Sequence, residues 1–149
     1  MIRELSPADM DDLLDRELVG RIGCCADDLV YVVPVNFAHV NGHIYGQTVE
    51  GMKVQIMRKN PRVCFEVDSL RGIFDWASVI LWGTFRELEG DEAERARSLL
   101  LQKLRRFAAV HESRQLLEER FLRAPYIEGR TPVVFAIDVS ERTGRCEQR

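Results

Sequence analysis

The sequence predicts a mainly β fold, a small antiparallel barrel accompanied by α-helices. About six segments are rich in β-branched and aromatic residues and are bounded by turn residues, which is typical of strands. Neighbouring segments are joined by short turns, of which Asn41-Gly42 is the strongest hairpin signal. Few helical segments separate the strands, and this argues against a parallel sheet built from βαβ units. Strands linked by hairpins in this number favour a small antiparallel barrel.

The first expected element is a helix over residues 6–17. Ser6 can accept a hydrogen bond as its N-cap, and Pro7 suits the first helical position. Asp9 places a negative charge beside the free amides of the first turn. The apolar side chains that follow recur on one face, which the helix is expected to bury.

The other elements follow from the same kinds of signal. Asp27-Asp28 marks a turn, and Asn60-Pro61 stops a short helix. In chain order we expect strands at 19–26, 29–40 and 43–47, a helix at 51–59, a strand at 63–67, a loop at 69–75, a strand at 78–88, helices at 91–107 and 112–122, a loop at 124–131 and a strand at 133–139.

Length and composition indicate one globular domain over residues 1–149. The net charge of -3 at pH 7 gives no basic surface for nucleic acid. No stretch approaches the ~20 apolar residues of a membrane span, and the N-terminus lacks the apolar core of a signal peptide. We therefore expect a cytoplasmic protein.

The cysteines do not have the spacing of metal ligands. Cys24 and Cys64 lie in apolar segments and are expected to pack as small hydrophobic side chains. Cys146 lies near the end of the sequence and is expected to be an exposed free thiol.

A two-residue loop at Asn41-Gly42 would fix the register of the hairpin. Val40 would lie opposite His43, Ala38 opposite Tyr45, and Asn36 opposite Gln47. Because side chains alternate between the two faces of a strand, His39 and His43 would point to opposite faces and could not share a metal ion. His111 stands apart from both, and the sequence predicts no metal site.

The same alternation separates two faces of the hairpin. The expected core face carries Tyr31, Val33, Val35 and Phe37. The other face is mixed and mostly small, with Pro34, Asn36, Ala38, Tyr45 and Gln47. Such a face can be plain solvent surface, or it can receive a ligand or a second subunit. The residues alone leave these alternatives open.

Residues 47–53 lead from a strand through a loop into a helix. The first amides of a helix are free to donate hydrogen bonds and carry the positive end of its dipole. Lys53 adds a full positive charge there, and Thr48 can donate from its hydroxyl group. This arrangement suits a phosphate monoester. The alternative is that Lys53 is a solvated helix residue and Thr48 is only a cap.

Four segments together resemble a known family. They are Pro34-Val35-Asn36-Phe37, Gly51-x-Lys53, Arg58-x-Asn60-Pro61-Arg62-Val63-Cys64-Phe65-Glu66-Val67 and Ser78-Val79-Ile80-Leu81-Trp82-Gly83. Their order and spacing are similar to those of the pyridoxamine 5′-phosphate oxidase-like, FMN-binding split-barrel family. The likeness extends over residues 6–139, and the nearest subgroup is that of the short chains related to nitroimidazole-resistance proteins.

The resemblance implies a six-stranded split barrel that forms a homodimer with two FMN sites at the subunit interface. Backbone groups of Val35, Asn36 and Phe37 would border the isoalloxazine ring. Gln47, Thr48 and Lys53 would hold the phosphate end, and Ser78 would contact the flavin from the partner's side. Arg58 is either a further phosphate ligand or a surface helix residue.

The sequence departs from the family pattern at two of these positions. Gln47 stands where the family usually has Ser or Thr, and Met52 stands where the longer oxidases have Arg. The chain also lacks the C-terminal segment with which the true oxidases bind pyridoxal phosphate, so we do not expect a pyridoxamine phosphate oxidase.

Three functions are open at this point. The resemblance implies a flavin-dependent oxidoreductase that passes electrons to a small acceptor, such as a nitroaromatic compound or a quinone. The second is a non-catalytic module that stores or senses a flavin, a deazaflavin or haem. The third is an interaction domain whose ligand site has decayed.

Overall fold

The computed structural model of the protein describes residues 1–111, 115 and 129–148. The elements within these residues are β1 (Arg3–Glu4), α1 (Pro7–Arg16), β2 (Val19–Ala26), β3 (Leu29–Val40), β4 (His43–Val49), α2 (Met52–Lys59), β5 (Arg62–Gly72), β6 (Asp75–Glu87), α3 (Gly90–His111) and β7 (Pro132–Glu147). None of these helices combines the length and the apolar character that crossing a bilayer requires. The second expected helix, at 112–122, lies outside the described residues except for Gln115, as does most of the expected loop at 124–131.

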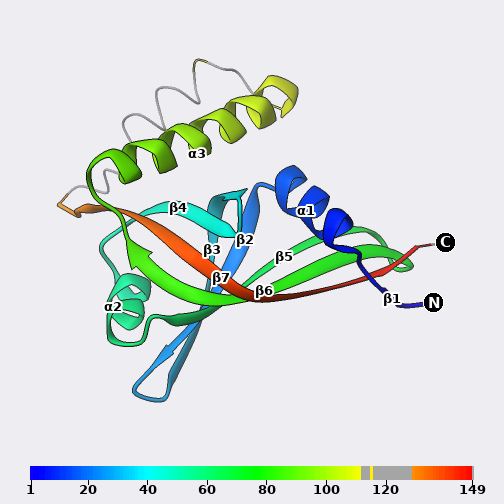
Figure 1. Ribbon diagram of the computed structural model, residues 1–149, viewed down its shortest axis with the longest axis horizontal. Coiled ribbons are helices and arrows are strands. Elements are labelled where there is room, and N and C mark those ends of the chain that lie inside the picture. The colour runs from blue at the N-terminus through cyan, green and yellow to red at the C-terminus, as the bar shows by residue number, and fades with distance from the viewer. Residues whose placement is uncertain (112–114, 116–128, 149) are drawn as a thin grey trace.

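The strands pair in antiparallel fashion and the sheet closes on itself. The strand order is β1-β7-β4-β3-β2-β5-β6, and β6 also pairs with β7. Strands β2 to β7 therefore form a closed ring of six, and the two-residue strand β1 only extends one edge of β7. Figure 1 shows this ring with α1 and α3 on its upper side and α2 at one end. The predicted fold, a six-stranded antiparallel barrel with helices, is confirmed.

Strands β5, β6 and β7 are longer than expected. The predicted loop at 69–75 is wrong, because Ser69 pairs with Ala77 and Leu70 with Trp76, so that the hairpin turns only at Ile73-Phe74. Likewise, β7 does not end at residue 139 but continues beside β6 to Glu147. Polar residues dominate these extensions, and the backbone pairing with a neighbouring strand, which local patterns do not reveal, makes them strands.

Helix α1 packs against the barrel with the capping expected at its start. The backbone N–H of Asp9 donates to the Ser6 hydroxyl oxygen at 3.1 Å, and the Ser6 N–H donates to the Asp9 carboxylate, which completes a capping box. The buried side chains of α1 join the main core of the barrel; they are Met10, Leu13 and Leu14.

The predicted core face of β3 is confirmed. Val35 and Phe37 are buried, and Tyr31 and Val33 pack partly buried against the same core. At its centre, the rings of Phe37 and Phe65 meet edge to face with their centroids 5.1 Å apart.

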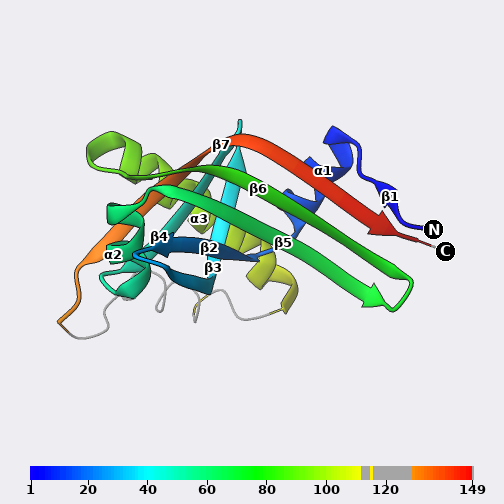
Figure 2. The ribbon, with the colours of Figure 1, turned by 90° about the horizontal axis from the view of Figure 1, so that it is seen from below.

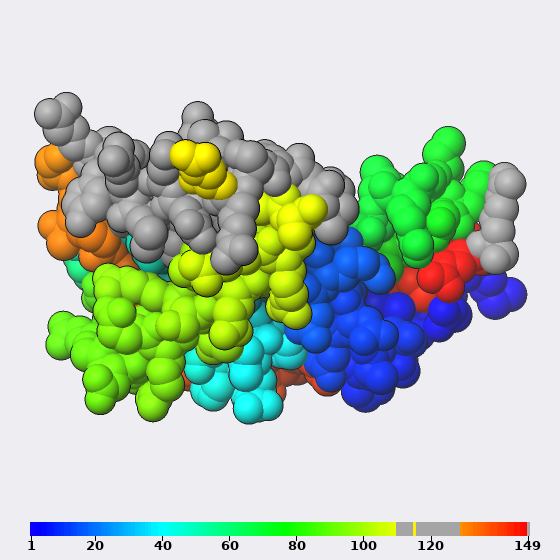
Figure 3. Space-filling view, turned by 90° about the horizontal axis from the view of Figure 1, so that it is seen from above, coloured from blue at the N-terminus to red at the C-terminus, as the bar shows by residue number. Residues whose placement is uncertain are grey.

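Helix α3 covers a second, smaller cluster on the outside of the barrel. Its buried members are Leu88, Ala93, Ala96, Val134 and Ala136. Tyr45 packs against this cluster, and Ala38, which lies opposite Tyr45 in the hairpin, is also buried. Figure 3 shows α3 and α1 side by side on this side of the molecule. Part of the mixed hairpin face is therefore covered within one chain, without a ligand or a partner.

Strand β3 changes its partner at Phe37. Residues 37–40 pair with β4 in the predicted register, with Ala38 opposite Tyr45. Residues 29–36 pair instead with β2. The predicted pairing of Asn36 with Gln47 is wrong, because the β3–β4 pairing ends at Phe37 opposite Gly46. Asn36 lies opposite Val19 of β2, and Gln47 lies opposite Val134 of β7. A tight turn fixes only the pairs near it, and strand twist in a closed barrel separates the rest of β4 from β3, while β4 stays paired with β7 along its whole length.

The four cysteines are free thiols. Cys24 is buried in the main core as expected. The predicted exposure of Cys146 is wrong, because its side chain is 0% exposed. Cys146 lies in the extended part of β7, between Arg3 of β1 and Ala77 of β6, and strands on both edges enclose it.

The outer face of β2, β5, β6 and residues 29–36 of β3 carries no described helix, as the view from below shows (Figure 2). Val32 of β3 and Trp82 of β6 are 65% and 40% exposed there. Val30 and Ile80 lie on the same face and are also exposed. Contiguous apolar surface of this kind marks a binding or association surface more often than plain solvent surface.

Candidate functional site

The split between β3 and β4 leaves one strand edge open. Over residues 29–36, β3 has β2 on one edge, and no strand of the described chain pairs with its other edge. Backbone N–H and C=O groups on such an edge are free to hydrogen-bond a ligand. Val35, Asn36 and Phe37, the predicted ring contacts, lie at this split. The side chains of Val35 and Phe37 are buried, so only backbone groups and the exposed side chain of Asn36 can reach a ligand.

Helix α2 follows β4, packs against β2 and carries Lys53 in its first turn. Its N-cap is Gly51, which has no side chain with which to bond the first amides. Lys53 is half-buried and has no ion-pair partner in the described part of the chain. Burial, and then the positive charge of Arg130, lower the pKa of the Lys53 ammonium group. A partly desolvated cation without a counter-ion is well suited to bind an anion.

Gln47 and Thr48 point to opposite faces of β4. Gln47 lies opposite Val134, on the face that α3 covers, whereas Thr48 is buried on the barrel side with Ile44. The structure therefore does not bring the two side chains together. The Oε1 atom of Gln47 is buried and has no hydrogen-bond partner among the residues that the structure describes. The roles of Gln47 and Thr48 at the phosphate stay predictions.

The guanidinium group of Arg58 is hydrogen-bonded to two carboxylates. Its Nε atom donates to Glu87 at 3.0 Å and its Nη1 atom donates to Glu50 at 3.1 Å. These contacts raise the pKa of the Arg58 guanidinium group, with the hydrogen bond to Glu87 as the first cause. Of the two roles left open by the sequence, the geometry favours that of a surface helix residue, since the donors that would face a phosphate already bond Glu50 and Glu87.

Arg130 lies beside the Lys53 corner, and no sequence signal pointed to it. Its Nη1 atom is 3.6 Å from the position that a Cβ atom on Gly51 would take. The sequence shows Arg130 only as a charged residue in an expected loop. Its proximity to Gly51 depends on the pairing of β4 with β7, which joins segments far apart in the chain.

Ser78 lies on the uncovered outer face of β6, opposite Asp68 of β5 and Arg145 of β7. Two strands separate β6 from β3 in either direction around the ring. At the usual strand spacing, Ser78 lies roughly 14 Å from β3 as measured along the sheet, and β6 is on the opposite side of the ring. One subunit therefore does not bring Ser78 to a ligand that contacts Asn36, and contact from a partner's side stays a prediction.

A cleft of about 550 Å³ opens on this same outer face. The strand register places Val32, Gly23, Cys64 and Trp82 in one row across its floor. A Cβ atom on Gly23 would lie 2.6 Å from the Sγ atom of Cys64, so the glycine leaves room for the thiol. Cys64, expected to pack as a small hydrophobic residue, is instead partly exposed in this cleft.

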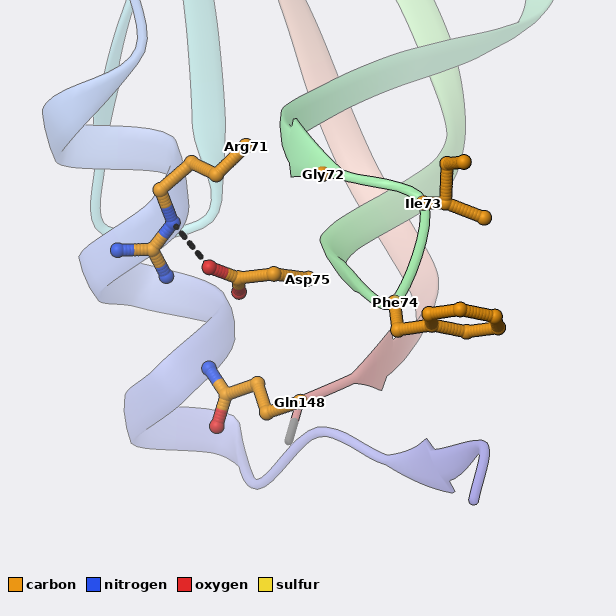
Figure 4. A pocket seen from close by; sticks show the side chains of 6 residues that line it. All are labelled: Arg71, Gly72, Ile73, Phe74, Asp75 and Gln148. Atoms are coloured by element: carbon orange, nitrogen blue, oxygen red, sulfur yellow. Dashed lines mark ion pairs between the residues drawn. The ribbon is translucent and has the colours of Figure 1, made fainter.

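Two further cavities lie away from the predicted site residues. One, of about 590 Å³, lies at the tip of the β5–β6 hairpin, where Arg71 and Asp75 form an ion pair at 3.5 Å and Ile73 and Phe74 point the other way (Figure 4). The other, of about 390 Å³, includes His39, and burial lowers the pKa of this imidazole. Neither cavity contains a predicted site residue.

The histidines of the hairpin have separate surroundings. His43 approaches Asp138 with its Nδ1 atom 2.8 Å from a carboxylate oxygen, whereas His39 lines the cavity beside α1. Within residues 1–111, 115 and 129–148, no three His, Cys, Asp or Glu side chains are grouped so that they could hold a metal ion.

Known proteins identify the family of this chain. The family model described as pyridoxamine 5′-phosphate oxidase matches residues 6–145. The crystal structure of a FAD-binding protein from Mesorhizobium loti is 28% identical, with a TM-score of 0.74, and the match covers 97% of this chain and 96% of that chain. An uncharacterized protein from Rhizobium meliloti (strain 1021) is 30% identical over 87 residues, which span 58% of this chain and 58% of that relative's length.

A third relative shares the fold alone. The crystal structure of a candidate 5-nitroimidazole antibiotic resistance protein from Bacteroides thetaiotaomicron is 15% identical, with a TM-score of 0.69 and coverage of 97% of this chain and 87% of that chain. The match to the family model extends over nearly the whole chain and agrees with the closed six-stranded ring. The chain therefore belongs to the pyridoxamine 5′-phosphate oxidase family and has the split-barrel fold that its sequence resemblance implied.

Proposed function

We propose that the protein is a cytoplasmic homodimer that binds FMN at its subunit interface and passes electrons to a small acceptor, such as a nitroaromatic compound or a quinone. The observation that carries this proposal is the half-buried ammonium group of Lys53, which has no counter-ion in the described part of the chain. The similarity to a FAD-binding protein of the same fold supports a flavin as the ligand.

The residues present fit a flavin nucleotide. Lys53 would bind the phosphate, and the free first amides of α2 would add hydrogen bonds to it. The open edge of β3 at Val35 and Asn36 would offer backbone donors and acceptors to the ring. When bound, the flavin supplies the redox chemistry, and the chain supplies binding, orientation and exclusion of water.

The exposed apolar face supports the dimer. Val32, Ile80 and Trp82 are exposed on strands whose outer face no described helix covers. A second copy seated there would bury these side chains at about 25 cal/mol per Å² of apolar surface. It would also bring its own Ser78 towards the β3 edge of the first subunit, which Ser78 of the same chain does not reach.

The first test is the absorption spectrum of the purified protein, followed by titration of the apoprotein with FMN. We expect flavin absorption bands and binding of FMN. Lys53→Met should weaken FMN binding by about 1.5–3 kcal/mol, the scale of a hydrogen bond to a charged group. Lys59→Met is the matched control, because Lys59 lies on the same helix and pairs with Asp27 at 2.9 Å.

The second test is anaerobic reduction of the bound flavin by NADH or NADPH, followed by addition of a nitroaromatic compound or a quinone. Reduction and reoxidation support the oxidoreductase. A bound flavin that no nicotinamide donor reduces would instead indicate a non-catalytic module. A colourless protein that does not bind added FMN, or one that purifies with the Soret band of haem, would overturn the proposal.

A further inference from the structure

We propose that Arg130 is a second anion-binding residue beside Lys53, and that the two side chains together bind the phosphate group of a flavin nucleotide. This inference rests on the proposed function for the identity of the ligand. It adds a ligand residue from the segment just before β7 to a site that the sequence places only at residues 47–53.

The backbone fixes Arg130 next to the start of α2. Val49, at the end of β4, pairs with Pro132, at the start of β7. The N–H group of Glu50 then donates to the carbonyl oxygen of Thr131 at 2.8 Å. These contacts hold residue 130 beside Gly51, where the Nη1 atom of Arg130 lies 3.6 Å from the position that a Cβ atom on Gly51 would take, an ordinary contact distance.

The carboxylates of this corner are already paired. Glu50 lies in the same loop as Gly51, and Arg58 binds its carboxylate at 3.1 Å. Glu87 is also bound by Arg58, at 3.0 Å. Lys53 and Arg130 have no ion pair with any described residue. The corner therefore presents two positive charges that the described chain does not neutralise.

Two like charges held close together repel each other, and an anion placed between them removes this repulsion. The effect of Arg130 on Lys53 is visible in the pKa of the lysine, which the arginine lowers in addition to burial. A phosphate monoester carries close to two negative charges at neutral pH and offers several acceptor oxygens. The guanidinium group can bond two of these oxygens at once, while the ammonium group acts as a point charge.

The ligand test uses three flavins that share the isoalloxazine ring and ribityl chain: riboflavin has no phosphate, FMN ends in a phosphate monoester, and FAD continues through a pyrophosphate to adenosine. FMN, FAD and riboflavin are titrated into the wild-type protein, Arg130→Met and the control Arg71→Met. Arg71 is an exposed arginine at the tip of the β5–β6 hairpin. Arg130→Met should weaken FMN binding at least about tenfold and leave riboflavin binding unchanged, while Arg71→Met changes neither. Arg130→Lys, which keeps the charge, should recover part of the loss.

The outcomes separate this inference from the proposed function. Suppose that the wild type prefers FMN to riboflavin and that Arg130→Met binds FMN with the same affinity. This result overturns the role of Arg130 and leaves the proposed flavin site intact. Loss of FAD binding to the same extent means that the two cations hold the phosphate shared by both nucleotides. If Arg130→Met weakens the binding of FMN but not that of FAD, Lys53 and Arg130 require a terminal phosphate. A wild type that binds no flavin overturns the proposed function, and with it the ligand named here.

If the wild type binds no flavin, inorganic phosphate can still test whether Lys53 and Arg130 bind an anion. Sodium phosphate at millimolar concentration should raise the melting temperature of the wild-type apoprotein above that in sodium chloride of equal ionic strength. The increase should be absent in Arg130→Met and in Lys53→Met. An equal increase in the wild type and in both variants overturns the anion site.

Discussion

The ammonium group of Lys103 lies 3.8 Å from the centre of the Phe37 ring and donates a hydrogen bond to the carbonyl oxygen of Leu14 at 2.8 Å. Lys103 belongs to α3, Leu14 to α1 and Phe37 to β3, so this one side chain connects both helices to the barrel core. Its side chain is only 6% exposed. Burial lowers the pKa of Lys103 to about 8, although Asp15 and Glu17 oppose the shift and Arg106 adds to it.

Lys103 should make the stability of the protein depend on pH in the alkaline range. Between its folded pKa of about 8 and its ordinary value of 10.5, the unfolded chain binds more protons than the folded chain. The free energy of unfolding therefore rises as the pH rises through this window. The same contribution of Lys103 is lost as the pH is lowered through its folded pKa of about 8. Urea unfolding of the wild type and Lys103→Met at pH 7 and pH 10 measures the effect. The wild type should gain about 2 kcal/mol relative to the variant over this range. A difference between the two proteins that stays constant with pH would contradict this account.

Gly46 should not tolerate a larger side chain. It lies opposite Phe135 in the β4–β7 pair, and a Cβ atom on Gly46 would lie 2.3 Å from the Cζ atom of the Phe135 ring. Phe135 is fully buried and cannot move away without disturbing the core. Gly46→Ala should therefore lower the free energy of unfolding by about 1–3 kcal/mol.

The double variant Gly46→Ala with Phe135→Leu tests the cause of that loss. If the clash with the ring is responsible, the two substitutions together should cost less than the sum of their separate costs in urea unfolding. Strictly additive costs would show that another contact of Gly46 matters instead.

Val32→Glu should separate the proposed dimer into monomers. Val32 is 65% exposed in the row of apolar residues on the uncovered outer face, and a buried unpaired carboxylate at an interface is costly. Ile73→Glu is the control, since Ile73 is 83% exposed at the hairpin tip, away from that row. Sedimentation equilibrium of the three proteins measures the outcome. A wild type that sediments as a monomer, or a Val32→Glu variant that remains dimeric, would rule out this face as the interface.

Ser6→Ala should destabilise the protein through the start of α1. The Ser6 hydroxyl oxygen accepts the hydrogen bond of the Asp9 N–H, and losing an N-cap of this kind costs about 1 kcal/mol. Ser98→Ala serves as the control because Ser98 is an exposed serine inside α3. Chemical unfolding should show a change within about 0.5 kcal/mol for the control. Equal effects of the two substitutions would argue against the capping role.

Much of the local structure could be predicted from the residue pattern. Asp27-Asp28 and Asn41-Gly42 form the turns that were predicted from them, and both carry the positive backbone φ angles that short hairpins require. The strands on either side therefore have the expected ends at Ala26, Leu29 and Val40. Local patterns succeed here because turn chemistry and side-chain alternation act over only a few residues.

Tertiary structure decided the partners of those strands and the composition of the candidate site. Asn36 and Gln47 were expected to pair, but the pairing of β3 with β4 ends at Phe37 and Gly46, and Asn36 lies opposite Val19 while Gln47 lies opposite Val134. The same closure buries Cys146 between two strands and brings Arg130 beside Gly51. Lys53 was predicted as the cation of the corner from its place in a helix's first turn. Arg130 could not be predicted there, because it reaches the corner only through backbone pairs between segments far apart in the chain.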